Sequence, residues 1–209
     1  MATNPTITIV DYGMGNLSSV KKLVDSFGYS CLITNDPDII STAAKIILPG
    51  VGHFGRAMAN LKNLNLLEPL SYIANERKIP VLGICLGMQL MATYSEEGNV
   101  PGLGWIPGSV SKFDPQDKPS FKVPHTGWNT LTYRKLNCKL LDGIGATDEF
   151  YFVHSYFYQA DDENHILCKT KYEVEFVSGV QRENIIGFQF HPEKSHQLGA
   201  KLVHNFLMI

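Results

Sequence analysis

One cysteine lies in a spacing that suits nucleophilic chemistry. Cys85 stands between Gly83 and Gly87, and the apolar residues 81–84 before it predict a strand buried on both faces. The apolar spacing over residues 86–91 then predicts a helix. A cysteine at a sharp strand-to-helix turn projects above its sheet, and the N-terminal end of the helix favours its thiolate. A buried structural cysteine is the alternative, but the two glycines and the change of structure favour a nucleophile.

A base for this thiol is indicated near the C-terminus, where one of the seven histidines stands out. His191 follows a predicted strand over residues 187–190, and Glu193 lies two residues further on. Because residues two apart in extended chain point the same way, Glu193 can hold the imidazole as the third member of a triad. Pro192 between them stiffens the pair. An ordinary solvated pair is the alternative, and the cysteine turn in the same chain favours the triad.

A glycine-rich loop offers backbone donors to the same chemistry. Residues 45–48 predict another buried strand, and Pro49–Gly52 follows at its carboxyl end. The Gly-Val-Gly loop leaves backbone N–H groups free to turn inward, which suits an oxyanion hole. A simple turn is the alternative. Since the carboxyl ends of parallel strands meet at one rim, this loop and Cys85 are expected to lie close together.

The elements that position these groups follow from periodicity, and they predict one α/β domain over residues 1–209. In the first half we expect strands and helices in alternation, with helical spacing continuing from residue 61 to 73. After a polar loop the texture changes to short β-like runs separated by glycine, proline and asparagine, which predicts an antiparallel extension. The early elements are a strand over 7–10, a helix over 17–27, a strand over 31–33 and a short helix opened by 35–37. The later runs are 105–113, 123–133, 150–159, 166–173, 174–180 and 185–190, followed by a helix over 198–207.

Composition excludes several classes of protein. A chain of 209 residues with 44% hydrophobic and 18% charged residues can bury a core, and a net charge of −2 gives no basic surface for nucleic acid. The four cysteines have no Cys-x-x-Cys spacing, so neither a disulfide framework nor a zinc site is expected. No signal peptide, membrane span, metal motif or nucleotide motif is recognised. We therefore expect a soluble cytoplasmic protein that needs no metal or other cofactor.

These motifs together resemble a known family. Gly83–Gln89, Pro49–Gly52 and His191–Glu193 look like the signature of class I, triad-type, glutamine amidotransferases. Longer blocks narrow the resemblance to the glutaminase subunits of imidazole glycerol phosphate synthase, and it runs from Ile7 to the C-terminal helix. The longer blocks are Leu48–Gly55, Pro124–Asn129, Tyr151–Tyr156 and Gly187–Ser195.

The resemblance implies a fold, a reaction and a partner. The fold would be three-layered and flavodoxin-like, with a mostly parallel central sheet and an antiparallel extension. Cys85, His191 and Glu193 would hydrolyse L-glutamine, with the backbone N–H groups of Leu86 and Val51 as oxyanion hole, and the ammonia would pass to a cyclase subunit with a (β/α)8 barrel. The glutamine-binding positions of the family match Gly52, Gln89, Glu97, Ser155 and Tyr156. Its interface positions match Asn16, Trp128, Tyr151 and Lys194.

Other functions remain open at this point. A stand-alone γ-glutamyl hydrolase or cysteine peptidase could use the same cysteine turn without a partner. A non-catalytic scaffold is a second alternative, which the retention of all three triad residues disfavours. A paralogous amidotransferase subunit could supply ammonia to a divergent cyclase in a sugar-modification pathway. Thr126, where the family usually carries methionine, leaves room for that last alternative because it lies in an interface block.

Overall fold

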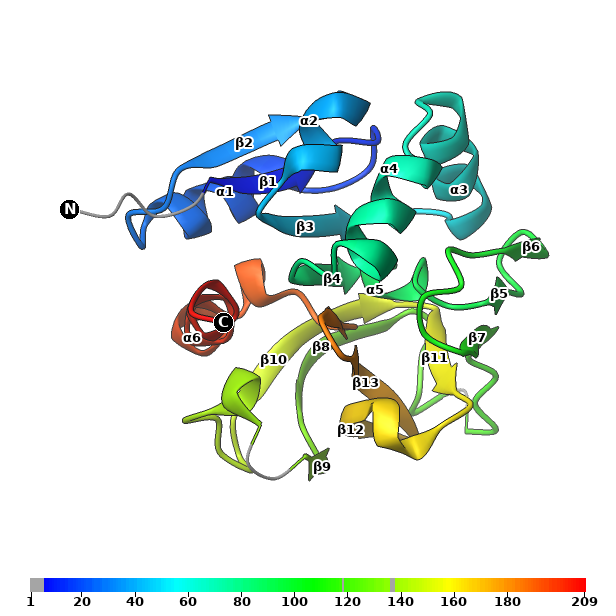
Figure 1. Cartoon of the computed structure of the whole chain (residues 1–209). Helices are drawn as coiled ribbons and strands as arrows, with labels where there is room; N and C mark the ends of the chain where they lie inside the picture. Colours follow the sequence, from blue (N-terminus) through cyan, green and yellow to red (C-terminus); the bar gives the residue numbers. More distant parts are fainter. Residues whose placement is uncertain (1–5, 118, 136–137) are drawn as a thin grey trace.

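The structure is a computed structural model that describes residues 6–117, 119–135 and 138–209 (Figure 1). Helices and strands alternate as far as β4, and strands then dominate until the final helix. The elements of the first part are β1 (Ile7–Val10), α1 (Leu17–Asp25), β2 (Cys31–Thr34), α2 (Pro37–Thr42), β3 (Lys45–Gly50), α3 (Phe54–Asn63), α4 (Leu67–Ser71), the π-helical turn η1 (Tyr72–Glu76), β4 (Val81–Cys85) and α5 (Leu86–Gln89). Those of the second part are β5 (Tyr94–Ser95), β6 (Val100–Pro101), β7 (Gly108–Lys112), β8 (His125–Thr130), β9 (Tyr133–Arg134), η2 (Lys139–Leu141), β10 (Glu149–His154), β11 (Tyr156–Ala160), η3 (Glu163–His165), β12 (Ile166–Tyr172), β13 (Val174–Arg182), β14 (Ile185–Phe188), η4 (Pro192–Lys194) and α6 (His196–Leu207).

The main sheet has a parallel half and an antiparallel half. Strands β2, β1, β3, β4 and β14 lie side by side in that order and are all parallel, which is the strand order of flavodoxin-like sheets. From β14 the sheet continues through β13, β11 and β7 with antiparallel pairing. Strands β8 and β10 pair separately, in an antiparallel two-stranded sheet. The predicted α/β fold with an antiparallel extension is confirmed.

Alternation along the buried strands creates the three layers. Ile46 and Leu48 belong to a core cluster that also contains buried residues of α2, α3 and α4. Ile47, between them, points to the opposite face and packs in a second cluster with residues of α1 and α6. Both faces of the parallel half are thus covered by helices, as Figure 1 shows. This arrangement explains why its strands consist of nearly continuous apolar runs.

Two segments that were predicted from periodicity as single elements each contain two elements in the structure. The apolar spacing over residues 61–73 is not one helix, because α3 ends at Asn63 and Asn65 adopts a left-handed conformation with φ 56° before α4 begins. The run over residues 150–159 contains two strands, β10 and β11, which belong to different sheets and separate at Ser155. Local hydrophobic spacing does not record such changes of direction.

The last predicted β run, over residues 185–190, belongs to the parallel half of the sheet and not only to the antiparallel extension. Strand β14 ends at Phe188, two residues earlier than the run, and it pairs in parallel with β4 as well as antiparallel with β13. It is therefore the fifth strand of the parallel half and the junction with the extension. This position brings the segment that follows β14 beside the end of β4.

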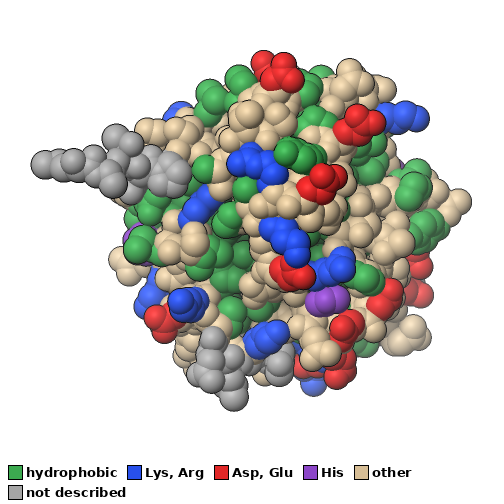
Figure 2. Space-filling model, viewed as in Figure 1, with side chains coloured by type: hydrophobic (Ala, Val, Ile, Leu, Met, Phe, Trp, Pro, Cys, Tyr) green, Lys and Arg blue, Asp and Glu red, His purple; other side chains and the backbone are tan. Residues whose placement is uncertain are grey.

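The surface shows charges of both signs. On the face drawn in Figure 2, acidic and basic side chains are interspersed, and no single-sign patch covers the face. Among the helices of the described ranges, none is long and apolar enough to cross a membrane.

Candidate active site

The cysteine turn is tight and depends on glycine. Cys85 ends β4 with φ 53° and ψ −108°, a backbone conformation that costs free energy for a residue with a side chain. A Cβ atom on Gly87 would overlap the carbonyl of Leu48 on the neighbouring strand, and one on Gly83 would lie 2.7 Å from the carbonyl carbon of Gly87. The turn therefore packs backbone against backbone, and glycine is required on both sides of the cysteine.

The helix after Cys85 is shorter than its apolar spacing predicts. Helix α5 covers only Leu86–Gln89, a single turn. The carbonyls of Leu90 and Met91 accept instead from the backbone N–H groups of Leu103 and Trp105. The expected helix over residues 86–91 is wrong in its length: the N–H groups of Met91 and Ala92 donate to carbonyls only three residues back, and the carbonyls of Leu90 and Met91, taken by the returning chain, cannot continue the helix. One turn of aligned peptides contributes only a small dipole, so other groups must support a thiolate at Cys85.

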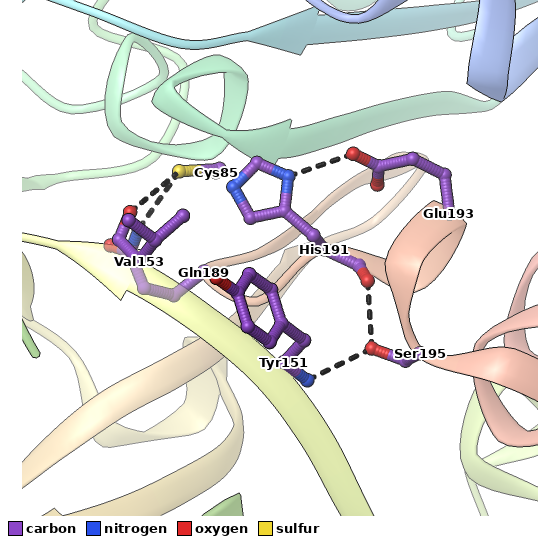
Figure 3. A network of polar contacts seen from close by, with 7 residues as sticks. All are labelled: Cys85, Tyr151, Val153, Gln189, His191, Glu193 and Ser195. Carbon is purple, nitrogen blue, oxygen red and sulfur yellow. Dashed lines mark hydrogen bonds and ion pairs between the residues drawn. The ribbon is translucent and has the colours of Figure 1, made fainter. Parts of the chain in front are cut away.

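His191 and Glu193 form a buried pair. The imidazole Nδ1 and a carboxylate oxygen of Glu193 are 2.8 Å apart, and the two side chains are 1% and 2% exposed. The chain between them is the 3-10 turn η4 rather than extended backbone, so the expected extended geometry is wrong although the contact exists. The imidazole Nε2 has no hydrogen-bond partner of its own and faces the sulfur of Cys85 in Figure 3. The structure thus brings the three predicted catalytic residues together.

Backbone contacts fix the position of His191. Its N–H donates to the carbonyl of Tyr151 on β10 at 2.9 Å. Its own carbonyl accepts from the hydroxyl of Ser195 at 2.7 Å, and that hydroxyl accepts in turn from the N–H of Tyr151 at 3.0 Å (Figure 3). Ser195 is buried and was not identified from the sequence, although it closes the motif that begins at Gly187. The network joins the end of β14 to β10.

The electrostatics of the pair favour a charged imidazole. Burial by itself lowers the pKa of His191, but its interactions with the Cys85 sulfur and the Glu193 carboxylate outweigh burial and raise the pKa to about 9. A raised imidazole pKa next to a thiol is the condition for an imidazolium–thiolate pair. The site therefore combines a cysteine thiol with an imidazole that can hold its proton.

The glycine-rich loop lies directly beside Cys85. Strand β3 pairs with β4 so that Gly50 is opposite Cys85, as expected for two loops on one rim. Val51 is exposed and Gly52 has φ +111°. A Cβ on Gly50 would overlap the buried hydroxyl of Tyr12, which requires glycine there as well. The first residue of the loop is thus held against the cysteine, and the side chain of the next residue is exposed.

A cavity of about 280 Å³ opens over the cysteine. All five positions predicted to bind glutamine line it: Gly52, Gln89, Glu97, Ser155 and Tyr156. The cavity also includes residues that sequence reasoning missed: Pro124, Val153 and His154. One carboxylate oxygen of Glu97 accepts from the N–H of Phe54 at 2.7 Å, which ties the residue to the start of α3.

The positions predicted at a subunit interface lie on nearby elements. Trp128 on β8 is 43% exposed, and its ring lies 5.9 Å from that of Tyr151 on the paired strand β10. The Lys194 ammonium lies 5.7 Å from the centre of the Tyr151 ring. Asn16 precedes α1 on the loop after β1, at the carboxyl-end rim of the sheet. Three of the four residues therefore form one cluster beside η4.

Among the residues within the described ranges, no group of three or more His, Cys, Asp or Glu side chains could hold a metal ion. The reactive groups are a thiol, an imidazole and a carboxylate at the carboxyl-end rim of a mostly parallel sheet. This set of groups is the one that cysteine-dependent acyl-transfer enzymes use.

Comparison with known proteins identifies the family. The family model described as glutamine amidotransferase class-I matches residues 8–209. The chain is 49% identical over 201 residues to imidazole glycerol phosphate synthase subunit HisH 2 of Methanococcus maripaludis, covering 96% of this chain and 98% of that protein. It is 47% identical to subunit HisH of Archaeoglobus fulgidus, covering 97% and 98%. The chain belongs to the class-I glutamine amidotransferase family.

Solved structures agree on the fold. PurLQS from Thermotoga maritima gives a TM-score of 0.75 and 18% identity, with 99% of each chain covered. A crystal structure described as a glutamine amidotransferase is similar with a TM-score of 0.72 and 16% identity, over 96% of this chain and 97% of that one. The expected class I amidotransferase fold is thereby confirmed, and the chain is an enzyme of this family.

Proposed function

We propose that this chain is the glutaminase subunit of an imidazole glycerol phosphate synthase, acting as one domain over residues 1–209. It hydrolyses L-glutamine and passes the ammonia to a cyclase subunit with a (β/α)8 barrel, within a cytoplasmic heterodimer of histidine biosynthesis. The observation that carries the reaction is the hydrogen bond of His191 to Glu193 while its Nε2 faces the Cys85 sulfur beside the cavity (Figure 3). The names of relatives that are 40–49% identical support this role and its pathway.

The reaction follows from the order of the three groups. His191 takes the proton of the Cys85 thiol, and the thiolate attacks the carbonyl carbon of the substrate side-chain amide. The tetrahedral intermediate collapses when the imidazolium gives its proton to the leaving nitrogen, so ammonia departs and a γ-glutamyl thioester remains. Water, deprotonated by His191, then cleaves the thioester to glutamate and the free thiol. Glu193 holds the imidazole by its Nδ1 and balances the imidazolium charge throughout.

The oxyanion of the intermediate needs two backbone donors. Leu86 directly follows the nucleophile, so its N–H lies on the same turn as the sulfur. Val51 supplies the second donor from the loop beside Cys85. Because one such donor is worth about 10²–10³ in rate, a partner that favours the inward-turned loop would raise the glutaminase activity by a similar factor.

The cavity offers complementary groups to glutamine. The carboxylate of Glu97 suits the α-ammonium group of an amino acid, and the backbone around Gly52 and Ser155 can bond to its polar atoms. Gln89 uses its Nε2 hydrogens on the carbonyl of Tyr156 and on another glutamine, both at 2.9 Å. Its Oε1 therefore remains available to accept from the amide of the substrate.

The cluster of Trp128, Tyr151 and Lys194 suits docking of the cyclase, with Asn16 as a further contact on the same rim. An exposed tryptophan with a stacked neighbour is typical of an interface anchor: its ring is nearly parallel to that of His196 at a centroid distance of 5.0 Å. The cluster adjoins η4, which carries Glu193. A partner seated here would contact the element that orients the base.

The test separates making ammonia from using it. In a complex reconstituted with the cyclase, Cys85→Ala should lower glutamine-dependent product formation by at least about 10³-fold. With ammonium salt at high pH the same complex should keep the activity of the unmodified complex. Cys31→Ala, which removes a thiol far along the chain, is the matched control and should change neither activity.

Three results would contradict the proposal. Retention of glutamine-dependent activity by Cys85→Ala would exclude Cys85 as nucleophile. Loss of ammonia-dependent activity would mean that Cys85 acts in docking or in the acceptor reaction. Equal glutaminase rates of the unmodified chain with and without the cyclase would favour a stand-alone hydrolase.

A further inference from the structure

A second glutamine lies against the nucleophile and has no assigned role. Gln189 follows β14, and its side chain is completely buried. Its Nε2 lies 3.6 Å from the sulfur of Cys85, within hydrogen-bonding distance for sulfur (Figure 3). An amide buried without partners would cost free energy, so its hydrogen bonds must be satisfied inside the site.

The orientation of this amide is fixed by a chain of hydrogen bonds. The carbonyl of Tyr156 can only accept, so the atom of Gln89 that faces it at 2.9 Å must be Nε2. The same Nε2 lies 2.9 Å from the side chain of Gln189, which must therefore present its Oε1 there. The other atom of that amide, facing Cys85, is then the N–H donor. A backbone carbonyl thus determines, through two amides, that the sulfur receives a hydrogen bond.

The sheet holds Gln189 at this position. Phe188 at the end of β14 pairs with Ile84 on β4, which places the residues that follow them, Gln189 and Cys85, side by side. The backbone N–H of Gln189 donates to the carbonyl of Ser178 at 2.9 Å and anchors the segment to β13. The contact with sulfur is therefore built into the pairing of the strands.

Besides the imidazole, two polar groups contact the sulfur, and they have opposite effects on its charge. The carbonyl of Val153 lies 3.9 Å from the sulfur and can only accept, so only the protonated thiol can donate a hydrogen bond to it. The N–H of Gln189 is closer and stabilises the thiolate, because donors favour a charged acceptor. Since α5 is a single turn, this donor is well placed to support the thiolate that a longer helix would otherwise stabilise.

We propose that Gln189 is a positioning residue for Cys85: its N–H stabilises the thiolate and holds the sulfur between the imidazole and the substrate cavity. Gln89 anchors it in this orientation. The inference rests on the proposed function only in taking Cys85 as the nucleophile, and it adds a residue that is not itself part of the cavity lining.

Two variants isolate the donor. Gln189→Glu keeps an oxygen for Gln89 and replaces only the N–H that faces the sulfur. Gln189→Met keeps the length of the side chain and removes both hydrogen bonds. Gln159→Met makes the same replacement at an exposed glutamine on β11 and is the matched control.

The measurement is alkylation of Cys85 by iodoacetamide over a range of pH, with the adduct located by mass mapping. In Gln189→Met the rate near neutral pH should fall about tenfold, the worth of one hydrogen bond to a charged group, and the midpoint of the pH–rate profile should move up by about one unit. Gln189→Glu should show a larger shift, and the control none. Glutaminase kcat should fall in parallel while KM changes little.

The outcomes are distinguishable from failure of the proposed function. Alkylation needs neither glutamine nor a partner, so an unreactive Cys85 in the unmodified chain would contradict the nucleophile itself. Profiles of Gln189→Glu and Gln189→Met that superimpose on that of the unmodified chain would overturn the positioning role. A variant with reduced activity but an unchanged profile, or with alkylation of the buried Cys168, would show that Gln189 matters only for folding.

Discussion

A buried pair of histidines next to the cavity should make the protein sensitive to acid. His154 and His125 are 6% and 3% exposed, and their rings are joined by a hydrogen bond of 3.0 Å. Because the carbonyl of Tyr156 lies 2.8 Å from Nδ1 of His154, that nitrogen carries the proton and Nε2 accepts from Nδ1 of His125. The remaining nitrogen of His125 accepts from the amide of Asn129 at 3.3 Å. Both rings are therefore neutral, each as one tautomer.

The loss of stability in acid follows from the pKa values of the two histidines. Burial lowers the pKa of His125 to about 4, and that of His154 to about 3, from the 6.5 expected in the unfolded chain. A histidine with a lowered folded-state pKa contributes its full stability above 6.5, loses it as pH falls below that value, and has none left below the folded pKa. At about pH 5, 1.5 units below 6.5, the loss is about 2 kcal/mol for each ring and about 4 kcal/mol for the pair.

The variant His125→Asn tests this value. The Nδ2 of asparagine is bonded to Cγ, as Nδ1 of histidine is, so the asparagine amide can still donate to His154. Unlike the imidazole, the amide does not titrate. Urea unfolding of both proteins between about pH 8 and pH 5 gives the difference in free energy of unfolding, in which all other titrating groups, His191 included, cancel. At high pH the variant is less stable, since the ring also stacks on Tyr172 at 4.1 Å. The difference in free energy of unfolding between the unmodified protein and the variant should be smaller by about 2 kcal/mol at about pH 5 than at about pH 8.

A difference that stays constant with pH would refute the reasoning, because it would mean that His125 is protonated as easily in the folded protein as in the unfolded one. For His154→Asn, the difference in free energy of unfolding from the unmodified protein should decrease in the same way over this range. It should go on decreasing at lower pH, because the folded-state pKa of His154 is lower than that of His125.

Two further outcomes are expected. In the unmodified chain, iodoacetamide should label Cys85 well before Cys31, because burial raises the pKa of the Cys31 thiol to about 11; equal labelling by mass mapping would contradict an activated thiol at the turn. Gly87→Ala should lower the free energy of unfolding by about 2–3 kcal/mol or more in urea titrations, since its Cβ would overlap a backbone carbonyl of β3. Gly145→Ala, where the nearest atom is 3.5 Å away, should have little effect, and similar losses in both would mean that the turn tolerates a side chain.

The sequence alone was sufficient where short-range patterns encode the structure. The glycines around Cys85 predicted its tight turn, and apolar runs such as 45–48 predicted the buried parallel strands. The proximity of β3 and β4 loops also followed, because parallel strands end at one rim and Gly50 indeed pairs with Cys85. The contact of His191 with Glu193 was expected from their spacing, although the turn that makes it is helical rather than extended.

Tertiary structure decided what depends on partners distant in the chain. Residues 102–106 donate to the carbonyls of residues 90–93, so the chain cannot continue as a helix beyond α5, and the hydrophobic spacing contains no trace of these contacts. Gln189 gave only a weak signal, a polar residue in an apolar run, and its role emerged when strand pairing set it against Cys85, 104 residues earlier. The direction of its amide, like the tautomers of His125 and His154, is fixed by the carbonyl of Tyr156. Hydrogen-bond polarity is a property of the assembled network, and no residue of that network specifies it by itself.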